Sequence, residues 1–195
     1  MKFLLNLPGL LIAIVLHELA HGYTAYLLGD YTAKESGRLS LNPLKHIDPM
    51  GFLFMLIFRF GWAKPVPIDP RYFKNRKRDM FLVSIAGIVT NFILAFVCAL
   101  IIAYIPIRNS TVFEIVLITM WYNIMLGVFN LLPFPPLDGS KMLASFLPTK
   151  YEYYFYKYER YFYFILIILI MTDMTDRIMS PIINFVINLI IRIIS

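Results

Sequence analysis

Three ionisable residues interrupt an apolar stretch at residues 14–29, which reads IVLHELAHGYTAYLLG. His17 and His21 are four positions apart, so on a helix they project from one face and can hold a single Zn²⁺. Glu18 follows the first histidine, and in an H-E-x-x-H helix the glutamate stays off the metal and acts as general base on a zinc-bound water. An ionisable group inside a membrane helix costs about 2.5–3.5 kcal/mol on insertion scales. Three such groups so close together therefore indicate a metal site rather than a hydrogen-bonded helical core.

A catalytic zinc usually has three protein ligands and an open position for water, so one ligand remains to be found. Asp138, in FNLLPFPPLDGSKML, is the strongest candidate because it is an acid in apolar surroundings at the end of a long apolar segment. The alternatives are His46, the only other histidine, and Glu35, which would imitate soluble zinc peptidases. Glu35 lies in a polar loop, and for His46 a surface or interfacial position is the simpler interpretation. We expect one Zn²⁺ per chain, held by His17, His21 and Asp138.

The elements that carry these residues have the composition of membrane helices. Of the 195 residues, 59% are hydrophobic and 15% are charged, and the mean hydropathy is +0.70. This composition indicates an integral membrane protein. A bilayer core needs about 20 apolar residues in a helix. Five segments come near that length: 4–28, 80–104, 112–132, 154–172 and 178–194. The sequence thus predicts an all-α polytopic membrane protein with about five transmembrane helices.

A shorter apolar run, MGFLFMLIF at residues 50–58, is followed by a strongly basic loop. The run is too short to span a bilayer, and we expect a re-entrant or interfacial hairpin. The loop at residues 62–79 carries six basic and two acidic residues, so the positive-inside rule places it in the cytoplasm. The first helix would then run inward, with the two histidines toward its cytoplasmic end.

The chain's charge and organisation bear on its partners. The net charge of +6 does not indicate nucleic-acid binding, because the basic residues concentrate beside apolar segments, as in cytoplasmic loops. Residues 1–195 are expected to form a single integral membrane domain. A catalytic core would cover about 4–148, and a C-terminal helical pair about 154–195, whose tyrosine-rich start is typical of a membrane-interface anchor. No particular oligomeric state is indicated.

Five stretches taken together resemble the successive motifs of the site-2 protease family of intramembrane zinc metalloproteases: HELAHGYTAYLLGD, GRLSLNPLKHIDPMG, GWAKPVPIDPRYF, SIAGIVTNF and NLLPFPPLDGSKML. They follow one another in order over about residues 4–148. The pair formed by HExxH and NxxPxxPLDG is specific. The likeness is greatest to the minimal prokaryotic branch of the family, which lacks PDZ and CBS domains.

This resemblance implies a role for each matching residue. His17 and His21 would ligate zinc, Glu18 would be the base, and Asp138 would be the third ligand. The resemblance also implies a three-helix catalytic core with the metal inside the membrane near its cytoplasmic side, the side that the charge distribution favours. The chain has Ile88 where the family's AGP pattern has proline, a departure that concerns a local kink rather than the chemistry.

Two asparagines could assist this site. By the family resemblance, Asn130 could hydrogen-bond the scissile carbonyl or the developing oxyanion, although it could instead cap a helix that Pro133 ends. We favour the functional role for Asn130. Asn91 is expected either to buttress the site or to bond a neighbouring helix, and the sequence favours neither.

These features predict a multi-pass protein of the cell membrane, with the lipid bilayer and single-span membrane-protein substrates as its partners. It would be a zinc-dependent intramembrane endopeptidase that cleaves their transmembrane segments. Zinc would lower the pKa of a bound water, and Glu18 would remove its proton and then protonate the leaving amine. A membrane zinc transporter or metal sensor with the same ligands is the alternative, but it has no need of a general base. A scaffold that binds membrane proteins without cutting them is a weaker alternative, because no motif looks disabled.

Overall fold

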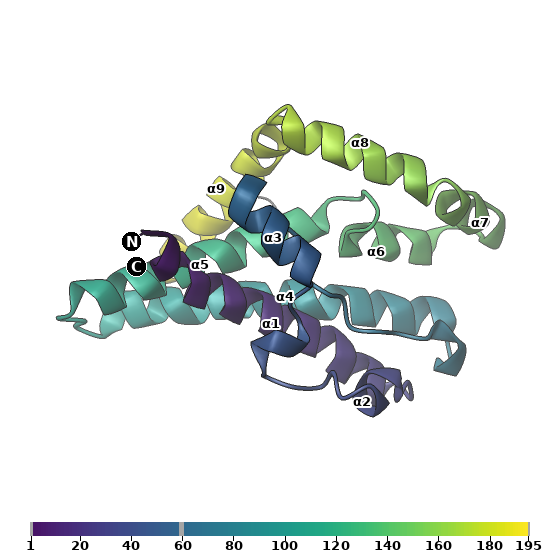
Figure 1. The fold of residues 1–195 in the computed structure, drawn as a ribbon, viewed down its shortest axis with the longest axis horizontal. Helices are drawn as coiled ribbons and strands as arrows, with labels where there is room; N and C mark the ends of the chain where they lie inside the picture. The colour runs from purple at the N-terminus through teal and green to yellow at the C-terminus, as the bar shows by residue number, and fades with distance from the viewer. Residues whose placement is uncertain (1, 59–60, 195) are drawn as a thin grey trace.

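The computed structural model describes residues 2–58 and 61–194, and helices dominate this part of the chain (Figure 1). The helices are α1 (Lys2–Leu27), α2 (Thr32–Glu35), α3 (Pro49–Phe58), α4 (Arg76–Tyr104), α5 (Ser110–Leu131), α6 (Asp138–Phe146), α7 (Thr149–Lys157), α8 (Glu159–Met171) and α9 (Met174–Ile194). Two short 3₁₀ turns, at Pro43–Lys45 and Pro70–Tyr72, lie in the connecting loops. Among the described residues, β pairing is limited to one isolated antiparallel bridge between Ile47 and Ala63. The predicted all-α fold class is confirmed.

Four of the described helices are long and apolar enough to cross a membrane, namely Leu5–Leu27 within α1, and α4, α5 and α9. Helices suit such segments because a bilayer offers no water to satisfy backbone N–H and C=O groups. In the most apolar 18-residue stretch of each helix, at most 33% of the residues are buried inside the protein, which leaves a broad apolar face for lipid. The chain is therefore a polytopic membrane protein.

The structure differs from the prediction of about five spans at residues 154–172. That segment is divided at Tyr158 between α7 and α8, and α8 has 13 residues, fewer than the roughly 20 that a span needs. Charged side chains surround the break, with Lys157 before it and Glu159 and Arg160 after it. The continuous apolar helix is therefore shorter than the predicted span at residues 154–172, because the first residues of that segment belong to the polar, tyrosine-rich helix α7.

The run at residues 50–58 also differs from its prediction, since it forms the single helix α3 rather than a hairpin. A proline at the first helical position and an aspartate before it favour a helix start. Pro49 occupies that first position, and the Asp48 carboxylate accepts a hydrogen bond from the Gly51 N–H at 2.8 Å. With 10 residues, α3 is too short to span a bilayer, as the sequence predicted.

Helices α1, α4 and α5 pack against one another and form the predicted three-helix core, with α9 against α4 and α5. Small buried residues such as Ala95 and Ala99 of α4 let these helices approach closely. Helix α6 lies against α4 and the end of α5, and Figure 1 shows it on the same side of this core as α3 and α8. The first residue of α6 is thereby brought to the centre of the chain's fold.

The segment between α3 and α4 is held against the end of α1 by two buried charged residues. Asp30 is fully buried, and its carboxylate accepts hydrogen bonds from the backbone N–H of Thr32 at 2.9 Å and of Asp69 at 2.7 Å. Arg38 donates to the carbonyl oxygens of Lys64 at 2.6 Å and Pro65 at 3.2 Å. These bonds fix an irregular stretch of backbone beside α1, where it can contact the HExxH residues.

Candidate metal centre

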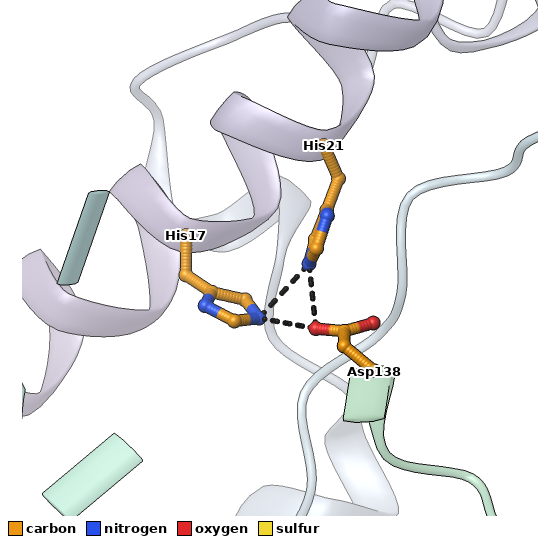
Figure 2. A group of neighbouring side chains, drawn as sticks. All are labelled: His17, His21 and Asp138. Carbon is orange, nitrogen blue, oxygen red and sulfur yellow. Dashed lines mark hydrogen bonds and ion pairs between the residues drawn. The ribbon is translucent and has the colours of Figure 1, made fainter. Parts of the chain in front are cut away.

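The three predicted ligands meet in one buried group at the three-helix core (Figure 2). His17 and His21 project from one face of α1, and Asp138 faces them from the start of α6. Asp138 Oδ2 lies 3.1 Å from His17 Nε2 and 2.8 Å from His21 Nε2, and the two Nε2 atoms are 3.0 Å apart. The exposed fractions of the three residues are 4%, 5% and 5%. Residues 117 positions apart in the sequence thus present their ligand atoms to one point.

This donor set fits a zinc ion. Two imidazole nitrogens and one carboxylate oxygen are ordinary zinc ligands, and three protein ligands leave a position open for water. Ligand atoms about 2.0–2.1 Å from a tetrahedral zinc are separated from one another by about 3.3 Å. The observed separations of 2.8–3.1 Å are slightly shorter than that value, so a small outward adjustment of the side chains would accommodate the ion.

The path of the chain after α5 explains how Asp138 reaches the histidines. Helix α5 ends at Leu131, and three prolines in the next five residues prevent it from continuing. The chain turns back, so that Gly139 lies directly against the end of α5. A Cβ atom at Gly139 would lie 2.3 Å from the Leu131 carbonyl oxygen, so only glycine fits this close return.

Gly87 of α4 provides the space for the two imidazole rings. A Cβ atom at this position would lie 2.5 Å from His21 Nε2 and 2.7 Å from His17 Nδ1. The rings therefore pack against bare helix backbone. Sequence reasoning did not assign Gly87 a role, although its place in the SIAGIVTNF stretch was a signal that could have been followed.

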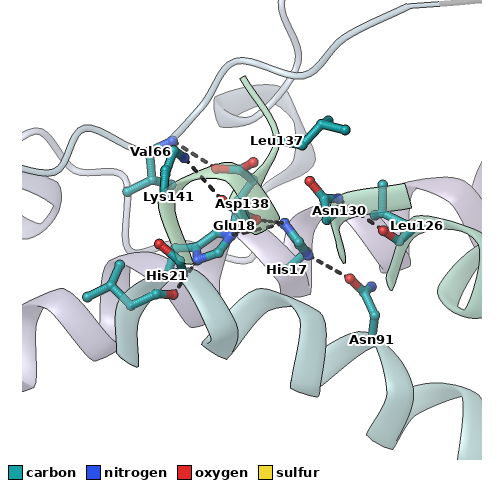
Figure 3. A network of polar contacts seen from close by, with 12 residues as sticks. His17, Glu18, His21, Val66, Asn91, Leu126, Asn130, Leu137, Asp138 and Lys141 are labelled. Carbon is teal, nitrogen blue, oxygen red and sulfur yellow. Dashed lines mark hydrogen bonds and ion pairs between the residues drawn. The ribbon is translucent and has the colours of Figure 1, made fainter. Parts of the chain in front are cut away.

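Each candidate ligand residue also makes a hydrogen bond through the atom of its side chain that faces away from the ligand cluster (Figure 3). The nitrogen His17 Nδ1 lies 2.6 Å from Asn91 Oδ1, and His21 Nδ1 lies 2.7 Å from the Val83 carbonyl oxygen. Lys141 Nζ donates to Asp138 Oδ1 at 3.0 Å. Such bonds fix the orientation of metal ligands, and a histidine that donates its Nδ1–H to an acceptor becomes a more basic ligand at Nε2. Sequence reasoning missed Lys141, whose signal was its position one helical turn after the candidate acid.

Glu18 lies outside the group of ligand atoms found among the described residues. The residue is half-buried, and its Oε2 accepts a hydrogen bond of 2.8 Å from the backbone N–H of Val66 (Figure 3). Val66 belongs to the stretch between α3 and α4 that is held against α1. The Glu18 carboxylate is thus adjacent to the candidate ligands in sequence, but its hydrogen bond is to the Val66 backbone rather than to the ligand group.

The other sequence candidates have separate environments. Asn130 is 9% exposed, and its Nδ2 donates to the Leu126 carbonyl oxygen at 3.0 Å, a bond within α5. Glu35 is an exposed residue at the end of α2. His46 is 1% exposed, and its Nε2 bonds the Ser40 carbonyl oxygen at 2.7 Å, so it is buried inside the protein and does not lie on the surface. Neither His46 nor Glu35 joins the ligand group formed by the described residues.

Comparison with known proteins finds relatives among zinc metalloproteases. The sequence model of peptidase family M50 matches residues 102–172. "Putative zinc metalloprotease YwhC" of Bacillus subtilis (strain 168) is 37% identical over 183 residues, which are 90% of this chain and 84% of that relative. "Putative zinc metalloprotease Rip2" of Mycolicibacterium smegmatis is 31% identical over 74% of this chain and 58% of that relative. "Zinc metalloprotease MJ0392" of Methanocaldococcus jannaschii is 29% identical over 74% of this chain and 34% of that relative. No solved structure matches the chain significantly.

A helical membrane fold with an H-E-x-x-H helix and a buried group of two histidines and one carboxylate defines the class of membrane metallopeptidases. The chain belongs to peptidase family M50, the site-2 protease family, and is a zinc metalloprotease.

Proposed function

We propose that this protein is an intramembrane endopeptidase that cleaves single-span membrane proteins within or beside their transmembrane segments. The observation that carries the proposal is the position of the ligand group. Two of its members, His17 and His21, lie within the span Leu5–Leu27, and all three are buried where α1, α4 and α6 meet. This position supports a substrate peptide bond that lies within or beside a transmembrane segment.

In this proposal His17, His21 and Asp138 hold one zinc ion per chain. When bound, zinc supplies Lewis-acid chemistry: it acidifies water and polarises a carbonyl oxygen. The protein positions the three donor atoms, and it excludes bulk solvent from them, because each ligand residue is at most 5% exposed. Charge interactions at such a dry site are stronger than in water.

Glu18 is proposed to move the proton. It is half-buried and adjacent to His17, and it points to the side of the helix where the Val66 N–H holds its Oε2. A carboxylate held by one oxygen can use the other to accept a proton from the attacking water and to return it to the leaving amine. We assign this exchange to Oε1. The Val66 bond would hold the carboxylate in place between the two transfers.

The substrate has to be unwound before this chemistry can occur. In a helix each carbonyl oxygen is bonded to the N–H four residues later, so the scissile carbonyl is hidden until the segment is locally extended. Asn130, near the end of α5, is proposed to stabilise the developing oxyanion. The structure gives Asn130 a local partner, since one N–H of its amide donates to the Leu126 carbonyl oxygen within α5, and the proposed contact with substrate would use the second N–H of the same amide.

The orientation in the membrane is part of the same proposal. The basic residues Arg71 and Lys74 are exposed in the loop that precedes α4, and Arg76 is exposed at the first position of α4. An earlier stretch of that loop contacts Glu18 through Val66. Basic loops favour the cytoplasmic side. The active site of this multi-pass protein is therefore proposed to lie toward the cytoplasmic face of the cell membrane.

The test compares wild type with Glu18→Gln for zinc content and for cleavage of a panel of single-span membrane peptides in reconstituted vesicles. Glu35→Gln is the matched control, because it makes the same change at an exposed acid of α2. We expect zinc to be retained near one per chain in all three proteins, with cleavage lost only in Glu18→Gln. Cleavage by Glu18→Gln at the wild-type rate would contradict the proposal, as would zinc-loaded wild type that cuts soluble peptides but no membrane peptide.

A further inference from the structure

We propose that Asn91 and Asn123 are positioning residues that together hold His17 in the tautomer with the proton on Nδ1 and the lone pair on Nε2. The inference rests on the proposed function, in which His17 binds zinc. Nε2 is the ring nitrogen that faces the other two ligands, so zinc binding needs the lone pair on that atom. The three residues lie on three helices, with His17 on α1, Asn91 on α4 and Asn123 on α5. Both asparagines are fully buried.

The donor and acceptor roles in this series of hydrogen bonds are set by a backbone carbonyl oxygen, which can only accept. The Thr119 carbonyl oxygen lies 2.8 Å from the side-chain amide of Asn123, so Asn123 has to present its Nδ2 donor to it. The Oδ1 atom of Asn123 is then turned toward α4, where it lies 2.9 Å from Asn91. The backbone of α5 thus determines which end of the Asn123 amide faces Asn91.

The same reasoning fixes Asn91. Its Nδ2 atom faces Asn123 Oδ1 at 2.9 Å and the Ala13 carbonyl oxygen at 3.2 Å, and both of these are acceptors. The two N–H groups of the amide are therefore both used, one on each partner. Turning the amide over would place its oxygen against two acceptors in a fully buried site, which is strongly unfavourable.

The Asn91 oxygen consequently faces His17 Nδ1, at 2.6 Å. An amide oxygen only accepts, so Nδ1 has to carry the proton, and the lone pair of the neutral imidazole is left on Nε2. His21 reaches the same state more directly, since its Nδ1 lies 2.7 Å from the Val83 carbonyl oxygen. The His17 tautomer therefore depends on replaceable side chains, whereas the His21 tautomer depends on backbone.

The third histidine of the chain, His46, provides a reference for the opposite tautomer. His46 bonds the Ser40 carbonyl oxygen through Nε2 at 2.7 Å, so its proton belongs on Nε2. The sequence has three histidines, which makes their ring nitrogens separable by ¹⁵N NMR of histidine-labelled protein. Metal-free wild type at alkaline pH should show two rings protonated on Nδ1 and one on Nε2. His46→Gln assigns the odd signal.

The variants then separate positioning from a merely structural role. Asn91→Leu removes the acceptor for His17. Asn91→Asp keeps an acceptor for His17 but sets its second oxygen against Ala13 and Asn123, so it is compared by its His17 signals alone. Asn123→Leu leaves Asn91 held by Ala13 alone. Thr119→Val is the control, because it removes only a hydroxyl bonded to Ile115 within α5 and keeps the Thr119 carbonyl. The other variants are scored in metal-free protein by the His17 ¹⁵N signals, and by zinc affinity from chelator competition.

Asn91→Leu should shift the His17 signals away from the Nδ1-protonated pattern without changing those of His21, and it should lower zinc affinity by about 10- to 100-fold. Asn123→Leu should act in the same direction by a smaller factor, and Thr119→Val should stay within about threefold of wild type. Asn91→Asp should keep the Nδ1-protonated pattern of His17.

The inference is overturned if His17 in metal-free wild type is protonated on Nε2, a measurement that requires no variant to fold. It is equally overturned if Asn91→Leu keeps the wild-type His17 signals and zinc affinity, or if Asn91→Leu loses affinity while the His17 signals stay unchanged. Failure of the proposed function would look different, because wild type would then bind no zinc or cut no membrane peptide while the tautomer pattern still held.

Discussion

Lys141 donates a hydrogen bond to Asp138 Oδ1, while Asp138 Oδ2 is the atom that faces the two histidines. The two residues are three positions apart at the start of α6, so the helix itself brings the ammonium group to the carboxylate. One oxygen of the carboxylate is held by Lys141, and the other is presented to the metal position. The candidate third ligand is thus oriented from its own helix, whereas each histidine is oriented from α4.

Removing this ammonium group should loosen the third ligand. Lys141→Met keeps the length of the side chain but leaves Asp138 Oδ1 without its donor, so we expect zinc affinity to fall by about 10-fold or more. Lys141→Arg should restore most of the affinity. Lys150→Met, an equal change at an exposed position in α7, should have no effect in the same chelator competition. Equal affinity in Lys141→Met and wild type would show that Asp138 is oriented without Lys141.

Gly87→Ala should eliminate metal binding although it favours the helix. Alanine stabilises a helix interior by about 1 kcal/mol relative to glycine, so a simple propensity effect would raise stability. The added Cβ would lie 2.5 Å from His21 Nε2 and would displace the imidazole. We expect zinc below one tenth of the wild-type content, measured on folded protein after size-exclusion chromatography. Val89→Ala, at a residue of α4 that is 43% exposed, should bind zinc normally.

The identity of the third ligand is tested by comparing Asp138→Asn with His46→Gln. A neutral amide is a poor zinc ligand, so Asp138→Asn should lose zinc and cleavage together. His46 is buried away from the ligand group, and His46→Gln should keep its zinc even if the loop around Ser40 becomes less stable. Loss of zinc in His46→Gln with retention in Asp138→Asn would reverse the assignment.

Helix α3 is expected to influence which substrates are cut. Leu53 is 46% exposed, and Phe54 contacts the Trp62 ring at a centroid distance of 5.2 Å. Alanine at either position removes apolar surface without touching the ligand group, so zinc content should stay constant while the relative cleavage rates within a peptide panel change severalfold. Loss of zinc in these variants would assign α3 a structural role instead.

The sequence alone was enough to predict the candidate zinc-binding residues of the first helix and the all-α class of the fold. The i, i+4 histidines share a helical face because helix geometry is local, and long apolar runs form membrane helices because the bilayer allows little else. It overestimated the run at residues 154–172, where a local break at Tyr158 gives two shorter helices, and it expected a hairpin where α3 is a helix.

Tertiary structure decided the relationships between distant residues. It brought Asp138 within 2.8 Å of His21 across 117 positions, and it chose for Asn91 a place in which both expected roles hold, since this residue bonds His17 and also the neighbouring helix through Asn123. No local rule predicts such contacts, because they depend on how α1, α4, α5 and α6 pack. A residue's type and spacing determine which atoms it can offer, whereas packing alone determines the partner that each atom meets.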